Sequence, residues 1–281
     1  MTTALESAAD AYCWRLACRH YENFSVASWL LRGDLRLDLA RVYAFCRTTD
    51  DYGDEHGAAA RAHLQRWRTD ILDLFAGGLP THPVLVALRA TVERYGLPAE
   101  PFLNLIEANI QDQDVSTYAA WPALRAYCDK SAAPVGRIVL RLFGIHNPAA
   151  VPLSDNVCIG LQLANFAQDV SVDAAKGRTY LLQAELEAGG IAAATRAHCE
   201  RARALLASGR ELERMAPWPL RLQLALYRRG GLAIVDAVER LGYRTDRRRP
   251  VVSTTNRLLV LVRALRETRR EARGVRDLGT A

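Results

Sequence analysis

The sequence predicts an all-α protein, and three observations support that class. Apolar residues recur at helical spacing along most of the 281 residues, whereas the strict alternation of a half-buried strand is nearly absent. Half of the residues are hydrophobic and 24% are charged, which supplies a large core and excludes a disordered or collagen-like chain. No apolar run approaches the roughly 20 residues that cross a bilayer, so a polytopic membrane protein is excluded as well.

Ten helical segments are expected in order along the chain. They lie near residues 5–22, 35–53, 58–76, 83–95, 99–114, 121–143, 154–175, 190–215, 219–241 and 254–273. Gly96-Leu97-Pro98 ends one helix and Pro101 suits the first turn of the next. After a loop at 144–148, Ser154 or Asp155 is expected to cap the long helix that follows. With no linker and no repeat, residues 1–281 are interpreted as a single domain.

The formal net charge is +6, and the basic residues are nearly all arginine, with Lys130 and Lys176 as the exceptions. Such a chain suits nucleic acid, an anionic membrane surface or a phosphorylated substrate. No recognition motif accompanies the arginines, so no nucleic acid partner is expected. The basic stretches 247–249 and 266–276 are interpreted as a solvated face or tail, with peripheral membrane contact as the alternative. Six scattered cysteines and no signal peptide predict a cytoplasmic protein with reduced thiols.

An acidic cluster closes the second expected helix. Asp50 and Asp54 are one helical turn apart and share a face, with Asp51 beside them. Like charges at this spacing repel, so an unliganded helix gains nothing from them. A hard divalent cation such as Mg²⁺, which binds carboxylates and bridges to phosphates, reverses that cost. Arg47, one turn before Asp51, is placed to contact a phosphate oxygen.

A second cluster makes the metal interpretation stronger. Asn165, Asp169 and Asp173 follow one another at four-residue steps along an otherwise apolar helix, with Gln162 about one turn earlier. Such a polar stripe is costly unless partners satisfy it. Two facing stripes of this kind can hold two or three Mg²⁺ ions around one diphosphate. The basic side chains that follow, Lys176 and Arg178, can cover the phosphate oxygens.

The predicted chemistry follows from these charges. Magnesium ions and arginines stabilise a departing diphosphate, which leaves an allylic or cyclopropylcarbinyl carbocation. An apolar pocket protects that cation from water, and aromatic faces stabilise it by cation–π contact. The aromatic candidates are Tyr43, Phe24, Phe166 and Tyr127.

The sequence resembles the squalene/phytoene synthase family, and within it the bacterial hydroxysqualene synthase branch. The motifs that carry the resemblance are His20–Phe24, Tyr43–Arg47, Gln111–Asp114, Tyr127-Cys128, Ala133–Arg137, Gly160–Asp173, Lys176–Leu181, Gly242-Tyr243 and Arg247–Pro250. They span nearly the whole chain and are specific to the family as an ordered set.

The resemblance implies an isoprenoid-synthase fold, a helical bundle around a central active-site cavity. It implies Mg²⁺ bound by Asp50, Asp54, Asn165, Asp169 and Asp173, with an isoprenoid diphosphate as substrate. It also implies further diphosphate contacts and a substrate pocket, for which the candidates are His20, Gln162, Phe24, Tyr52, Tyr127, Val135, Gly136, Phe166, Ala167 and Tyr180.

Some positions depart from the family pattern. Gln168 and Phe166 match the hydroxysqualene synthase branch, but Ala167 stands where tryptophan is usual and Tyr52 where a smaller aliphatic residue is common. Two reactions therefore remain open. One gives a C30 product from farnesyl or presqualene diphosphate, and the other attaches a prenyl group to an aromatic acceptor in secondary metabolism. The proton acceptor is equally open among Tyr52, Tyr180 and the diphosphate.

Overall fold

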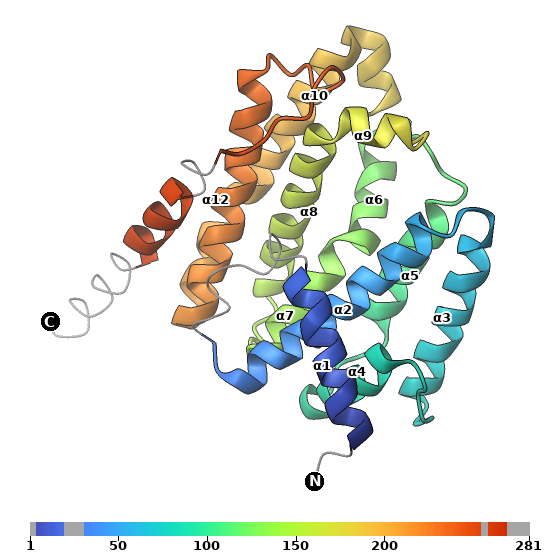
Figure 1. The fold of residues 1–281 in the computed structure, drawn as a ribbon. Helices are drawn as coiled ribbons and strands as arrows, with labels where there is room; N and C mark the ends of the chain where they lie inside the picture. The colour runs from blue at the N-terminus through green and yellow to red at the C-terminus, as the bar shows by residue number, and fades with distance from the viewer. Residues whose placement is uncertain (1–3, 20–30, 254–257, 269–281) are drawn as a thin grey trace, which may run out of the picture. The chain divides into compact units, whose positions relative to one another are not determined.

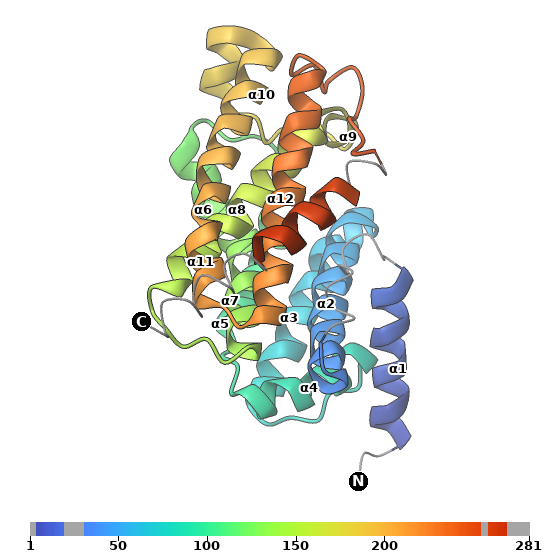
Figure 2. The same cartoon turned by 90° about the vertical axis from the view of Figure 1, so that its left-hand side faces the viewer.

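The computed structural model describes residues 4–19, 31–253 and 258–268 of the chain. Within these ranges the regular elements are helices, and the one β-type pairing is an isolated bridge between Tyr118 and Leu182. Figures 1 and 2 show this helical architecture from two sides. The all-α prediction is therefore confirmed.

The chain divides into two compact units. The N-terminal unit comprises Met1–Val115 and Pro134–His146, and the C-terminal unit comprises Ser116–Ala133 and Asn147–Ala281. Each unit has its own packed helices and is described by itself. The single domain expected over 1–281 stays a prediction.

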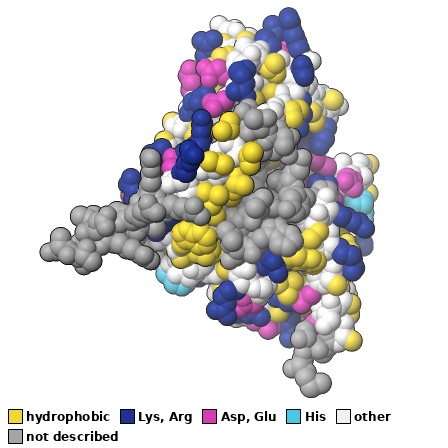
Figure 3. All heavy atoms as spheres, turned by 60° about the vertical axis from the view of Figure 1, so that its left-hand side comes forward, with side chains coloured by type: hydrophobic (Ala, Val, Ile, Leu, Met, Phe, Trp, Pro, Cys, Tyr) yellow, Lys and Arg dark blue, Asp and Glu magenta, His cyan; other side chains and the backbone are white. Residues whose placement is uncertain are grey.

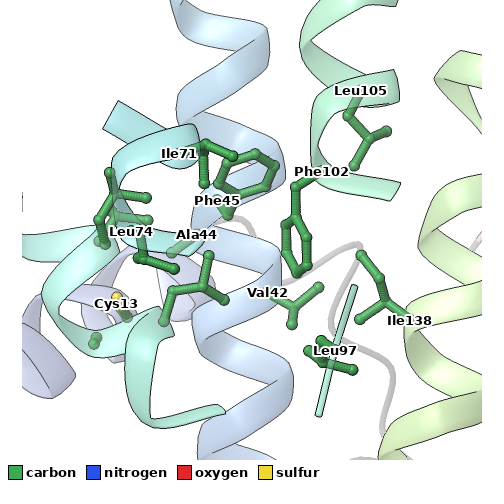
Figure 4. Close-up of a cluster of buried hydrophobic side chains, with 14 of the residues drawn as sticks. Cys13, Val42, Ala44, Phe45, Ile71, Leu74, Leu97, Phe102, Leu105 and Ile138 are labelled. Atoms are coloured by element: carbon green, nitrogen blue, oxygen red, sulfur yellow. The ribbon is translucent and has the colours of Figure 1, made fainter. Parts of the chain in front are cut away.

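The N-terminal unit is built around α2. Its helices are α1 (Ala4–Arg19), α2 (Gly33–Asp54), the short 3₁₀ helix η2 (Gly57–Ala59), α3 (Ala60–Phe75), α4 (Pro83–Tyr95), α5 (Glu100–Gln111) and most of α7 (Ala133–Leu142). The fully buried Phe45 of α2 stacks on Trp67 of α3, with ring centroids 5.7 Å apart, and meets the edge of Phe102 of α5 at 5.1 Å. Figure 4 shows Phe45 and Phe102 within this hydrophobic cluster. The apolar face of α2 thus fixes α3 and α5 around it.

A buried charge network joins α2 to α4 and α1. The carboxylate of Asp38 is fully buried and accepts hydrogen bonds from Thr91 Oγ1 at 2.7 Å and Arg94 Nη1 at 2.7 Å. Arg41 binds Asp38 at 2.9 Å and Asp10 of α1 at 2.8 Å. A buried carboxylate is tolerated only with such partners, so these contacts fix how the three helices pack.

The C-terminal unit is built around α8. Its helices are α6 (Trp121–Ser131), α8 (Ala150–Gln168), α9 (Val170–Ala175), α10 (Gln183–Ala207), α11 (Gly209–Met215), α12 (Trp218–Arg240) and the helical residues 258–268. Helix α8 contacts α6, α10, α11 and α12. Glycine allows α12 to approach α8 closely: a Cβ on Gly231 of α12 would lie 2.8 Å from Cδ2 of Leu161.

Three of the expected helical segments are each two helices in the structure. The segment 121–143 breaks at Ala132, 154–175 breaks at Asp169, and 190–215 breaks at Ser208. The first break has a simple cause, because Pro134 has no N–H to continue the hydrogen-bond ladder. Sequence periodicity misses such breaks because the apolar pattern resumes in nearly the same phase.

The predicted cap of the long helix is wrong. Helix α8 begins at Ala150, four residues before Ser154, and both Ser154 and Asp155 are buried inside it. The side chain of Asn147 instead accepts a hydrogen bond from the backbone N of Ala149 at 3.0 Å. The segment 183–189 is also helical, ahead of a kink at Gly190, whose φ is 71°.

Two smaller expectations concern membranes and thiols. None of the helices in the described part of the chain is both long and apolar enough to cross a bilayer. All six cysteines are free thiols, as expected, with Cys13, Cys128 and Cys199 buried.

Candidate functional site

The first acidic cluster occupies the last turn of α2, which ends at Asp54. The exposed carbonyls of a helix C-terminus carry partial negative charge, so carboxylates are unfavourable there. No basic residue lies in that turn. One counter-charge is Arg47, whose Nη2 lies 2.5 Å from Asp51 Oδ1 and 3.4 Å from Glu55 Oε1. The turn therefore holds more negative charge than its own residues compensate.

Asp50 lies among these carboxylates. Solvent reaches its side chain, but protein atoms closely surround it, and this desolvation raises the pKa of the Asp50 carboxyl to about 6. The negative charges of Asp54 and Asp51 raise the pKa further, while Arg47 and a hydrogen bond from Asn109 oppose the rise. A carboxylate in this state has much to gain from a bound cation.

Helix α5 supports this turn from one side. Asn109 donates from Nδ2 to Asp50 Oδ1 at 3.3 Å, and Gln113, just beyond the helix, donates from Nε2 to the carbonyl of Gly53 at 3.2 Å. A Cβ on Gly53 would lie 2.5 Å from Oδ1 of Asn109, so only glycine leaves room for this approach. Asn109 was not among the predicted site residues. No signal in the sequence singles it out, because α5 carries several other polar residues.

The second acidic cluster surrounds the break between α8 and α9. Asp169 leaves helical geometry with φ −101° and ψ 16°, yet its N–H still bonds the carbonyl of Asn165 at 2.8 Å. The N–H of Asp173 bonds the carbonyl of Asp169, also at 2.8 Å. The four-residue steps between these side chains therefore survive the break. Asn165 is exposed, and Gln162, Asp169 and Asp173 are half-buried, so solvent reaches the whole stripe.

Arg249 is an ion-pair partner of this cluster. Its guanidinium holds both carboxylate oxygens of Asp169, through Nε to Oδ1 and through Nη2 to Oδ2, the latter at 3.2 Å. The neighbouring Gln168 donates from Nε2 to the carbonyl of Pro250 at 2.8 Å. Two adjacent residues of the cluster thus tether the basic stretch 247–250.

The sequence did not place Arg249 in the site. It lies 80 residues from Asp169 in a stretch interpreted as a solvated face, and no spacing rule connects the two positions. The remaining predicted basic residues follow α9, where Arg178 donates its N–H to the carbonyl of Asp173 at 2.9 Å and Lys176 is exposed.

An aromatic cluster lies in the C-terminal unit, and it includes three predicted pocket residues. The rings of Phe166 and Tyr180 are stacked with centroids 3.9 Å apart and planes 7° from parallel. Tyr127 lies 5.7 Å from Tyr180 and 6.4 Å from Phe166. Tyr118, which was not predicted, completes the cluster at 5.4 Å from Tyr127. The buried Ala167 follows Phe166 in α8.

Buried polar groups hold Tyr180 in this cluster. His198 is fully buried, and its Nε2 lies 3.0 Å from the carbonyl oxygen of Tyr180. Its Nδ1 lies 3.7 Å from Glu185, whose pKa the hydrogen bonds and charges of His198 and Arg201 lower to about 2, against the effect of burial. The N–H of Gln183 also bonds the carbonyl of Tyr118 at 2.9 Å. These contacts fix the backbone on both sides of the rings.

Other predicted pocket residues belong to the N-terminal unit. Tyr52 lies in a separate ring cluster, 5.5 Å from both His63 and Trp67. Val135 packs against the core of that unit, and Gly136 is buried in α7. Tyr43 is half-buried on α2. The predicted contacts His20 and Phe24 lie outside the described residues.

The donor set fits magnesium in its chemistry. Each acidic cluster offers carboxylate oxygens that solvent reaches, and in the first the pKa of Asp50 is raised by burial and by the like charges of Asp54 and Asp51. Among the residues that the structure describes, no three His, Cys, Asp or Glu side chains form a ready-made metal cluster. The two acidic clusters belong to different units.

Fold and site together define a class, an all-α protein with an acidic cluster at the carboxyl end of a helix in each of its two units. The family model "Squalene/phytoene synthase" matches residues 17–256. The chain therefore belongs to the squalene/phytoene synthase family, a family of head-to-head isoprenoid synthases.

Individual relatives agree with this assignment. The chain is 32% identical to phytoene synthase 3 of Zea mays over 88% of its own length but spans only 63% of that relative. It is 31% identical to the 15-cis-phytoene synthase of Synechococcus elongatus, covering 94% of this chain and 96% of the relative. The solved squalene synthase HpnC from Alicyclobacillus acidocaldarius is 42% identical, with a TM-score of 0.79 over 85% of this chain and 95% of that one. The expected isoprenoid-synthase fold is thereby confirmed.

Proposed function

We propose that the protein is a magnesium-dependent isoprenoid synthase that converts farnesyl or presqualene diphosphate into a C30 product and diphosphate. The observation that carries the proposal is the pair of acidic clusters, each at the carboxyl end of a helix and each adjoined by an arginine. Arg47 adjoins the first and Arg249 the second. Anionic clusters flanked by arginine suit a substrate that brings phosphate together with metal cations.

The residues that would hold Mg²⁺ are Asp50, Asp51, Asp54, Asn165, Asp169 and Asp173. Bound there, the ions would act as Lewis acids that stabilise the negative charge of the leaving diphosphate. Arg47 and Arg249 would bind and orient the phosphate oxygens together with Gln162, Lys176, Arg178 and His20. On substrate binding, Arg249 would release the Asp169 carboxylate and bind phosphate instead. Its guanidinium would then be paired both without and with the substrate.

The aromatic cluster would act after the diphosphate departs. The faces of Tyr127, Phe166 and Tyr180 can stabilise a positive carbon, because aromatic rings carry negative charge on their faces. The same packed rings exclude water from the carbocation, except where a water is the nucleophile. Tyr180, whose backbone carbonyl lies 3.0 Å from Nε2 of His198, and the departing diphosphate would be the proton acceptors beside this cluster, and Tyr52 stays a third candidate.

An aromatic acceptor is the alternative reaction, and two observations weigh against it. Ala167 is fully buried in α8, and the Tyr52 ring packs on His63 and Trp67. The two side chains that depart from the family pattern therefore pack against other residues of the protein. The 42% identity to a squalene synthase supports the C30 reaction. A cytoplasmic location and the lack of a nucleic acid partner stay predictions.

The test is product analysis with the purified full-length protein. Farnesyl diphosphate and presqualene diphosphate are each supplied with Mg²⁺, with a matched reaction containing EDTA, and products are identified by mass spectrometry. We expect a C30 alcohol or hydrocarbon that EDTA abolishes. Turnover only in the presence of an aromatic acceptor would support the alternative. Consumption of neither diphosphate, or full turnover in EDTA, would overturn the proposal.

A further inference from the structure

A groove with a basic lining lies on the C-terminal unit, and none of its lining residues belongs to the acidic cluster of that unit. Its volume is about 390 Å³, and it is bordered by α10, α12 and the helical residues 258–268. Arg203, Arg229, Arg240 and Arg263 line it together with a single acid, Asp236, and the rest of its lining is apolar. The groove thus combines positive charge with apolar surface.

The arginines of the groove are not equally compensated. Arg203 is paired with Asp236 at 2.8 Å and with Glu239, and Arg229 binds Glu267 at 2.8 Å. Arg240 and Arg263 are exposed, and no ion pair joins either of them to an acid within the described residues. Two guanidinium groups therefore face the groove with their charge unbalanced, an arrangement that suits a phosphate.

Apolar side chains project beside these arginines. Leu258 is 60% exposed and Leu259 is 44% exposed. Leu259 and Arg263 are one turn apart on the helix, and both line the groove. Figure 3 is turned so that the side of Figure 1 carrying residues 258–268 comes forward, and it shows hydrophobic side chains gathered near basic ones.

The helix 258–268 is anchored, so its exposed leucines are held outward. Ala264 and Thr268, one turn apart, are buried on its inner face. Glu267 binds Arg228 at 3.0 Å and Arg229 at 2.8 Å, and Arg228 in turn pairs with the buried Glu213. The leucines thus cannot turn inward without breaking a largely buried ion-pair network.

We propose that this surface docks the protein peripherally on a membrane that contains anionic phospholipids. The headgroup phosphate lies between Arg240 and Arg263, and Leu258 and Leu259 enter the acyl boundary. The argument is charge complementarity combined with exposed apolar side chains, which is the pattern of interfacial helices. The inference is independent of the proposed reaction, because none of these residues belongs to the candidate site.

The test is sedimentation of the full chain with vesicles. Phosphatidylcholine vesicles are compared with vesicles that also contain phosphatidylglycerol, at low and at high salt. We expect binding to the anionic vesicles that salt weakens. The double variant R240Q/R263Q should reduce the affinity about 25-fold, since each basic residue near an anionic surface contributes about fivefold. L258S/L259S should also reduce the affinity for anionic vesicles. Because this variant removes apolar contacts and no charge, the size of its loss should change less with salt than that of R240Q/R263Q.

The matched control is R214Q, which removes an exposed arginine of α11 outside the groove. R214Q should reduce the affinity for anionic vesicles less than R240Q or R263Q alone, because it changes only the net charge. All variants should keep the thermal unfolding midpoint of the parent. Equal losses in R214Q and in each groove single variant would overturn the proposal. Unchanged vesicle binding in R240Q/R263Q would overturn it as well. Displacement from vesicles by inorganic phosphate, together with full binding by L258S/L259S, would also overturn it, because that result would indicate a site for free anions alone.

Discussion

The two acidic clusters of this protein differ in how their charge is balanced. In the first, Asp50, Asp51 and Asp54 crowd the end of α2, and the pKa of Asp50 rises to about 6. In the second, Asp169 is held by both arms of the Arg249 guanidinium. A bound cation would therefore relieve repulsion at the first cluster, whereas at the second it would have to replace an ion pair.

The largest expected effect tests what the clusters have in common. Asp50→Asn and Asp169→Asn should each reduce turnover by roughly 10³-fold, as losses of groups that stabilise charge in the transition state do. Initial rates with saturating Mg²⁺ give the comparison, and circular dichroism verifies that both variants are folded. Near-normal turnover in either variant would contradict the assignment of that cluster to the metal site.

Arg249 should sharpen the difference between the clusters. Arg249→Gln is expected to weaken binding of the diphosphate substrate about tenfold, since charge-assisted hydrogen bonds contribute about 1.5–3 kcal/mol. The same variant leaves Asp169 free of its competitor, so its apparent affinity for Mg²⁺ should increase. Substrate titrations and Mg²⁺ titrations separate the two effects. A lower Mg²⁺ affinity in Arg249→Gln would show that the guanidinium does not compete with the cation.

Gly53 probes the support that only the first cluster receives from α5. Gly53→Ala places a Cβ 2.5 Å from Oδ1 of Asn109 and should cost about 1–2 kcal/mol of unfolding free energy, because the packed neighbour must shift. Gly33→Ala, in the first turn of the same helix with nothing within 4 Å, is the matched control. Denaturant unfolding of both variants provides the measurement, and equal stabilities would contradict the close approach.

The clusters should respond with opposite signs when one charge is removed without metal. Asp50→Asn is expected to stabilise the metal-free protein by about 1 kcal/mol, a figure reduced for the solvent that reaches this side chain. Asp169→Asn is expected to destabilise it by about 0.5 kcal/mol, because its ion pair is partly exposed. Thermal unfolding in EDTA tests both. A shift of the same sign in the two variants would remove the distinction.

The pH dependence gives the smallest and most specific effect. A carboxyl whose folded pKa is raised destabilises the protein as it ionises, so the penalty grows from about pH 4 to about pH 6 and is constant above. The stability gap between Asp50→Asn and the parent should follow this course in EDTA. A gap that is already complete at pH 4, or that first opens above pH 7, would indicate another cause.

Much of the fold could be predicted from the sequence. Periodicity indicated a helical protein, and local punctuation such as Gly96 and Pro101 marked helix ends correctly because these residues act through their own backbone geometry. The breaks at Ala132, Asp169 and Ser208 were missed, because the apolar pattern continues across them with nearly the same phase. The early start of α8 was missed because the sequence favoured Ser154 and Asp155 as the cap. In the structure the side chain of Asn147 accepts a hydrogen bond from the backbone N of Ala149, ahead of the helix.

The sequence also predicted which side chains of the site are acidic and how they are spaced. Four-residue steps are a local property, and they persist even where α8 gives way to α9. The partners of those acids were not predictable. Asn109 reaches Asp50 from another helix, and Arg249 reaches Asp169 across 80 residues, so neither contact follows from spacing. The sequence predicted three members of the aromatic cluster but not Tyr118. Tyr118 packs on Tyr127, and its carbonyl accepts a hydrogen bond from the N–H of Gln183, so its place depends on a contact between distant segments.

The sequence by itself determined the helical class, the acidic clusters and the kind of ligand they suit, because these depend on residue type and on spacing within a helix. The tertiary structure alone decided how each charge is balanced, because that depends on distances between segments far apart in the chain. Identical carboxylates thus differ: Asp50 is left with a raised pKa among like charges, and Asp169 is paired with Arg249.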